Sequence, residues 1–160
     1  MTSQARPLDM GKYANQVLKT TTSLTVGVGS LEAPSSTPRR IALAELIVGS
    51  DAGTLGTSNF RFELQRSTTA ATGTSVTPNP LDPADAACSA VMKSNLTVQG
   101  TNTAGQIPLT IPLSQQATFR WVANPGYEII IPAVATNGLH LNTPVSGNNP
   151  SAVATMVFVE

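Results

Sequence analysis

The chain has little charge. Only 11% of its 160 residues are charged, against about 25% in a typical soluble domain. Nine basic and nine acidic residues give a formal net charge of zero, so no bulk field attracts a phosphate backbone or an anionic membrane. We therefore expect neither nucleic acid nor membrane as a partner. A net charge near zero also removes a barrier to self-association, which suits a protein that works in an assembly.

Cysteine and long apolar runs are also scarce. Cys88 is the only cysteine, which excludes an intrachain disulfide and a cysteine-based metal cluster. No run approaches the roughly 18 apolar residues of a spanning helix, and the first residues lack the apolar core of a signal peptide. The expectation is a soluble protein, made in a reducing compartment and stabilised by packing alone.

The chain is rich in Thr, Ser, Asn, Gly and Pro, residues that favour strands and turns over helices. Apolar and polar residues alternate in several segments, most clearly at 60–65 and 152–159, with the period of a half-buried strand. These patterns predict an all-β fold, an antiparallel jelly-roll-like β-sandwich of about eight strands. Residues 1–12 show no periodicity and are predicted to form an N-terminal arm before a single domain at 13–160.

Individual elements follow from local signals. Residues 39–48 are the most apolar and predict a central strand, whereas weak strands at 74–77 and 107–113 are predicted to lie at edges, the latter because of its prolines. The turn Asn124-Pro125-Gly126 predicts a hairpin in which 127–131 is the return strand for 117–123. The segment 81–92 is the only helical candidate, with Asp82 as a cap and Pro83 in the first turn, so at most one short helix is expected.

Catalytic patterns are missing. The only histidine, His140, is predicted to be a surface or half-buried side chain without a catalytic partner. No nucleophile elbow, phosphate loop or calcium loop is present. We therefore predict no enzyme activity, no cofactor and no metal. A hydrolase built from opposed carboxylates remains a third alternative, with Glu45, Glu63, Glu128, Asp82 and Asp85 as the available acids.

Arginines offer a different kind of site. Arg39, Arg40, Arg61, Arg66 and Arg120 could form a basic strip on one sheet face, but the strip lacks the lysines and interleaved aromatics of a nucleic-acid site. Arginine near tryptophan is more typical of a protein interface. For the tryptophan itself, a place in the core is preferred, because a second aromatic residue two positions earlier shares its face.

One family resemblance covers roughly residues 40–160. The segments Gln116–Ala133 (QATFRWVANPGYEIIIPA) and Phe60–Ser67 (FRFELQRS), with Asn137-Gly138-Leu139 and the Thr/Ala/Pro-rich part through Cys88, resemble small decoration, or cement, proteins of tailed phages. The resemblance implies a jelly-roll-type homotrimer on the outer capsid surface, assembled after synthesis in the host cytoplasm. Its partner would be the major capsid protein, whose neighbouring subunits it would hold together.

The leading hypothesis is therefore a non-enzymatic virion protein. A receptor- or carbohydrate-binding head of a tail fibre is the alternative, in which an exposed Tyr127 or Trp121 would stack on sugar. The residues predicted to make contacts to the shell lie in the arm and among the arginines: Arg6, Leu8, Met10, Tyr13, Arg39, Arg40 and Arg120.

Overall fold

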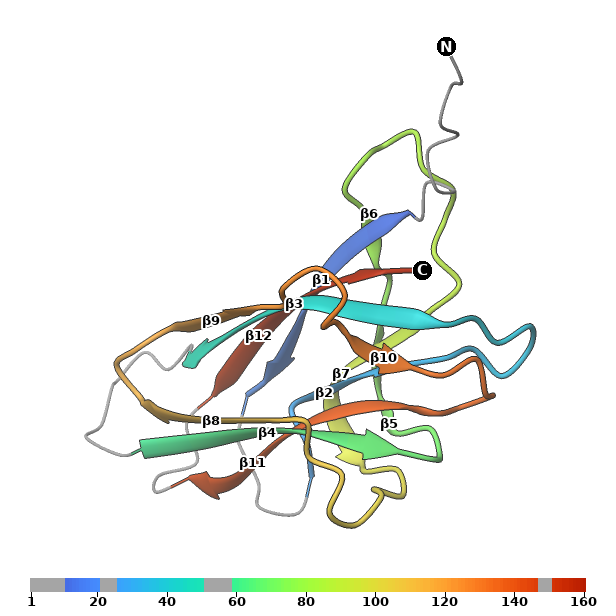
Figure 1. Ribbon diagram of the computed structural model, residues 1–160. Helices are drawn as coiled ribbons and strands as arrows, with labels where there is room; N and C mark the ends of the chain where they lie inside the picture. Colours follow the sequence, from blue (N-terminus) through green and yellow to red (C-terminus); the bar gives the residue numbers. More distant parts are fainter. Residues whose placement is uncertain (1–10, 21–25, 51–58, 147–150) are drawn as a thin grey trace.

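The computed structural model describes residues 11–20, 26–50, 59–146 and 151–160. These residues form two antiparallel sheets that face each other (Figure 1). The first sheet has the order β10-β3-β12-β1-β6, with β9 also paired to β3. Its strands are β1 (Lys12–Lys19), β3 (Ile41–Ser50), β6 (Asn79–Pro80), β9 (Phe119–Val122), β10 (Ile129–Ile131) and β12 (Ala152–Val159).

The second sheet has the order β5-β7-β2-β11-β4-β8. Its strands are β2 (Gly29–Glu32), β4 (Asn59–Ser67), β5 (Thr72–Val76), β7 (Val91–Val98), β8 (Leu109–Ser114) and β11 (Gly138–Ser146). All-β architecture with two packed antiparallel sheets is the predicted fold class, and the structure confirms it.

The strand order is that of a jelly roll. Strands β1, β12, β3 and the β9/β10 pair lie side by side in one sheet, and β2, β11, β4 and β8 lie side by side in the other. Successive strands β1 to β4 alternate between the sheets, which is the double Greek-key path. Strands β5, β6 and β7 extend the two sheets at one side. The described residues thus form twelve strands instead of about eight, because β9 and β10 share one position and three strands are added.

The core lies between the sheets and follows the predicted alternation. Along β12 the even-numbered residues from Ala152 to Phe158 are buried and their neighbours are partly exposed. In β4, Phe62 and Leu64 are buried while Arg61 is exposed. Burial of such apolar side chains contributes roughly 1.5–3 kcal/mol each to folding. The largest fully buried side chains come from both sheets: Phe62, Phe158, Leu31, Ile41, Leu43, Leu46, Leu64, Met92, Leu96, Ile131, Leu139 and Leu141.

The helical candidate at 81–92 does not form a helix, which agrees with the expectation of at most one short helix. The segment has a single turn, in which the Asp85 amide donates to the Asp82 carbonyl at 3.0 Å. The chain then runs without regular structure into β7. The amides of Ser89 and Ala90 donate to the Glu160 carboxylate at 2.9 and 3.0 Å. Because these donors are bound by a distant side chain, they are not free for helical bonds.

The predicted hairpin around Asn124-Pro125-Gly126 is wrong, although the turn itself is present. The Tyr127 amide donates to the Asn124 carbonyl at 2.8 Å, and Gly126 has a positive φ of 86°. However, β9 and β10 both pair with β3 in the same direction, at Glu45–Val48 and then at Ile41–Leu43. The loop 123–128 is therefore an excursion from one edge strand and not a reversal between two strands.

Candidate functional site

An exposed segment runs along one edge of the first sheet. The exposed side chains of β9 and of the loop after it are Phe119, Arg120, Val122 and Tyr127, here called the edge surface. Tyr127 is 79% exposed, Val122 53% and Phe119 41%. Aromatic residues and arginine are enriched in protein interfaces. The edge surface therefore has the composition of a contact site for another protein.

The arginine of the edge surface is held in place. Arg120 donates from Nε to Glu45 Oε1 at 2.6 Å and from Nη2 to Oε2 at 3.0 Å. Bidentate pairing fixes the orientation of a guanidinium group. The pairing also raises the pKa of Arg120 and lowers that of Glu45. Trp121, on the opposite face of β9 from Arg120, is partly buried against the core, in agreement with the preferred prediction, although Phe119, which shares its face, is exposed.

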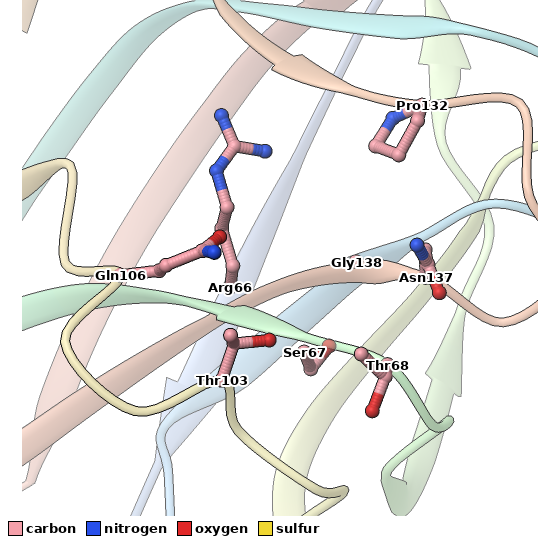
Figure 2. A pocket seen from close by; sticks show the side chains of 8 residues that line it. All are labelled: Arg66, Ser67, Thr68, Thr103, Gln106, Pro132, Asn137 and Gly138. Atoms are coloured by element: carbon pink, nitrogen blue, oxygen red, sulfur yellow. The ribbon is translucent and has the colours of Figure 1, made fainter.

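A polar pocket lies where β4 ends and β11 begins (Figure 2). Its volume is about 370 Å³. Its walls come from the end of β4, the start of β11, the β7–β8 connection and Pro132 after β10. The lining residues are Arg66, Ser67, Thr68, Thr103, Gln106, Pro132, Asn137 and Gly138.

Backbone hydrogen bonds fix one wall of this pocket. The β7–β8 connection runs beside the end of β4, where the Thr103 amide donates to the Arg66 carbonyl at 2.8 Å and the Arg66 amide donates to the Gln106 carbonyl at 3.0 Å. An isolated bridge joins Ser67 to Asn102. These bonds give the connection the geometry of an added strand, so the lining residues are held on a paired backbone.

Arg66 gives the pocket its charge. Arg66 Nη1 donates to the Ile130 carbonyl at 2.5 Å, and none of the ion pairs between described residues includes Arg66. Ser67 is 3% exposed, and its Oγ is buried from solvent without a hydrogen-bond partner among the described residues. The pocket therefore combines a cation with polar neutral residues, and no acidic side chain is part of its lining.

A buried ionic cluster lies behind the floor of the pocket. Gly138 pairs with Ser67 on one side and with Glu32 on the other. Glu32 Oε2 is 3.6 Å from Lys93 Nζ, and Glu32 Oε1 is 3.7 Å from His140 Nε2. Burial raises the pKa of Glu32, but the His140 imidazole, the Ala71 amide at 2.9 Å and the Lys93 ammonium lower it further, so the pKa lies below its ordinary value.

The expectation for His140 is thus wrong. The side chain is fully buried, between Leu139 and Leu141, which are also buried. The β7–β8 connection packs closely over the His140 ring: a Cβ on Gly100 would lie 2.7 Å from His140 Cε1. Sequence reasoning also missed Glu32, which was not among the candidate acids. The available signal was the cross-strand pattern: Ser30, opposite His140, and Glu32 occupy alternate positions of one strand.

A second carboxylate organises the segment around Cys88. Glu160 Oε2 accepts hydrogen bonds from the Cys88 thiol at 2.9 Å and from the amides of Ser89 and Ala90. Burial, followed by the hydrogen bond and charge of Glu160, raises the pKa of the Cys88 thiol to about 12. A thiol with such a pKa is poorly suited to nucleophilic chemistry.

The predicted interface residues lie apart from one another. Tyr13 is 5% exposed, stacks on Phe158 and donates from its hydroxyl to the Ala86 carbonyl, so it belongs to the core. Arg39 and Arg40 are exposed in the β2–β3 connection, and Arg39 Nε is 3.7 Å from Glu160 Oε1. Arg120 is exposed at the edge surface. Three further residues, Arg6, Leu8 and Met10, lie outside the described residues.

The predicted basic strip does not exist on one face. Arg61 and Arg66 belong to β4 in the second sheet, while Arg120 belongs to β9 in the first sheet. Arg61 Nε pairs with Glu63 at 2.8 Å. The arginines therefore act separately, and three of them, Arg39, Arg61 and Arg120, form ion pairs with three different glutamates.

Comparison with known proteins leaves the functional interpretation to this geometry. No protein-family model, curated protein or solved structure matches the chain. In the described part of the chain, no group of three or more His, Cys, Asp or Glu side chains is placed to hold a metal ion. The same residues include no helix long and apolar enough to cross a membrane.

Proposed function

We propose that the chain is a non-enzymatic structural protein of a phage virion, which binds the outer surface of the capsid and stabilises contacts between major capsid subunits. The observation that carries the proposal is the location of Gln116–Ala133, the segment with the strongest resemblance to decoration proteins. This segment contains the edge surface, and Tyr127 within it is 79% exposed.

The physical character of the edge surface supports attachment to a protein. Phe119, Val122 and Tyr127 offer apolar area that water leaves on binding, and Arg120 offers a preoriented donor group. An edge strand also presents backbone groups to a partner. Each copy needs only a modest affinity, because repetition over a symmetric shell multiplies weak contacts.

The absence of catalysis is part of the proposal. His140 is fully buried with Glu32 behind the pocket floor, where a substrate does not reach it. Two of the carboxylates considered for a hydrolase, Glu45 and Glu63, are paired with arginines on different sheets. A homotrimer is the assembly state that the resemblance implies, and sedimentation equilibrium at several concentrations tests it.

The test uses heads of the encoding phage that lack this chain. Val122→Ser combined with Tyr127→Ser should weaken co-sedimentation with heads by at least about tenfold, since interface anchors contribute more than about 1 kcal/mol each. The wild-type chain should also raise the temperature at which the heads disrupt. The matched control is Val98→Ser combined with Leu81→Ser, which removes residues of similar exposure, 58% and 57%, outside the edge surface. Equal binding by both double variants would contradict the proposal.

The proposed arm needs a separate variant. The first strand begins at Lys12, which pairs with Val159, and the Lys12 carbonyl accepts a hydrogen bond from the Leu81 amide. Deletion of residues 1–10 therefore leaves β1 intact. The deleted chain should keep its unfolding midpoint and bind heads more weakly; full-strength attachment would show that the arm makes no contact.

A carbohydrate-binding head is the second candidate function. The exposure of Tyr127 favours it, because an uncovered aromatic ring can stack on a sugar. Binding of the purified chain to host cells, lost in Tyr127→Ser, would favour this function. Attachment to heads without binding to cells would favour the decoration function.

A further inference from the structure

We propose that the polar pocket beside Arg66 binds a small hydroxylated carboxylic acid, of the size and chemistry of an acidic monosaccharide. This inference does not depend on attachment to a capsid. The carboxylate would pair with the Arg66 guanidinium, and the hydroxyl groups would bind the polar side chains of the other walls (Figure 2).

The charge of the pocket selects an anion. Arg66 is partly buried, and its guanidinium donates to the Ile130 carbonyl, which leaves other N–H donors for a ligand. No acidic residue lines the pocket. A partly buried cation without a carboxylate partner is stabilised by a bound anion, and the planar guanidinium group matches a carboxylate with two parallel hydrogen bonds.

The neutral groups select hydroxyls beside the carboxylate. Ser67 Oγ is buried from solvent and is therefore not offered to a ligand. Thr68, Thr103, Gln106 and Asn137 supply donors and acceptors from three separate segments. Convergent polar groups of this kind fix the orientation of a ligand. A simple apolar acid would leave most of them unpaired.

The size and the floor of the pocket fit one sugar ring. The volume of about 370 Å³ lies near the lower end of the roughly 300–1,000 Å³ that small-molecule sites occupy. Gly138 forms part of the floor, and a Cβ there would lie 2.6 Å from the Leu31 carbonyl oxygen. The nearest acid behind the floor, Glu32, is compensated by Lys93 at 3.6 Å. Its charge therefore does not cancel the attraction of Arg66.

The test measures binding of sodium glucuronate by NMR chemical-shift perturbation, with glucose as the neutral probe of the same shape. Glucuronate should bind with a dissociation constant of about 1 mM or tighter, and glucose should cause no saturable shifts at about 20 mM. Arg66→Gln should weaken glucuronate binding at least tenfold, and Thr103→Val at least threefold. The matched control is Arg61→Gln on the same strand, which should bind like the wild type.

Three results would overturn the inference: no saturable glucuronate binding, equal binding of glucose, or unchanged binding by folded Arg66→Gln and Thr103→Val. If Arg66→Gln unfolds, Thr103→Val and Asn137→Ala decide the question, because backbone hydrogen bonds of Thr103 and Asn137 hold these walls in place. A second experiment measures binding of a glycan that ends in glucuronate. Tighter binding of the glycan than of the free acid identifies a surface polysaccharide as the source, and equal binding identifies the free acid.

Discussion

The reactivity of Cys88 provides a sharp test of the local structure. Its pKa of about 12, against about 8.5 for a free cysteine, reduces the thiolate at pH 8 roughly two-thousandfold. The higher intrinsic nucleophilicity of a more basic thiolate recovers about fortyfold of this loss. Native Cys88 should therefore react with Ellman's reagent roughly fiftyfold more slowly than Cys88 in the urea-unfolded chain. Because it is the only cysteine, the absorbance signal has a single source.

The variant that tests the cause is Glu160→Gln. It removes the negative charge 2.9 Å from the thiol and replaces an acceptor by an amide. Loss of this charge should lower the pKa of Cys88 and accelerate the reaction at pH 8 several-fold, while Glu63→Gln, in the other sheet, should leave the rate unchanged. A native chain that reacts as fast as the unfolded chain would refute the assigned environment. So would a folded Glu160→Gln variant with the wild-type rate.

Three further predictions concern stability. Glu32→Gln should lower the free energy of unfolding in urea by about 2–3 kcal/mol, since it removes the carboxylate partner of the partly buried Lys93 ammonium. Glu63→Gln, in a surface pair, should lower it by less than about 1 kcal/mol; equal losses would contradict the buried cluster. The pKa values of Glu32 and Glu160 lie below their ordinary 4.5 in the folded chain. The free energy of unfolding should therefore be retained above about pH 4.5 and fall as the pH decreases further. A urea midpoint independent of pH from about 5 to 3 would exclude this linkage. Phe158→Ala should lower the free energy of unfolding by about 3–5 kcal/mol, because it opens a cavity in the core, and a loss below about 1 kcal/mol would place Phe158 outside it.

Much of the fold was predictable because alternation reports burial directly. In β4, apolar side chains at every second position have only one core to face, so its strand and inward face followed from the sequence. Both faces of β12 are mostly apolar, so its sequence predicted a strand but not which face is buried. Prolines in β8 and the weak pattern of β5 correctly indicated edge positions. The jelly-roll order was expected on the grounds of strand number and turn spacing, and the observed pairing agrees with it.

The errors arose where a distant partner decided local structure. Glu160 binds the amides of Ser89 and Ala90 from 71 and 70 positions away along the chain, which no helix signal at 81–92 reveals. The loop at Asn124-Pro125-Gly126 returns to β3 because the Ala123 amide donates to the Ala44 carbonyl at 2.8 Å.

The candidate sites were hard to predict for the same reason, because their residues come from distant parts of the chain. The pocket and the Glu32–His140 cluster unite residues of several strands and of the β7–β8 connection. A single sequence does not encode such pairing in its local patterns. The edge surface was partly predictable, because Arg120 and Tyr127 were chosen as contact residues from their chemistry alone.

The most direct test of the proposed attachment is hydroxyl-radical footprinting of the chain bound to heads, compared with the free chain. Binding through the edge surface should reduce oxidation of Phe119 and Tyr127 at least about fivefold, because a buried interface excludes water from its core. Oxidation of Leu81, which is 57% exposed elsewhere, should not change. Unaltered oxidation of Tyr127 in the head-bound chain would contradict the proposal.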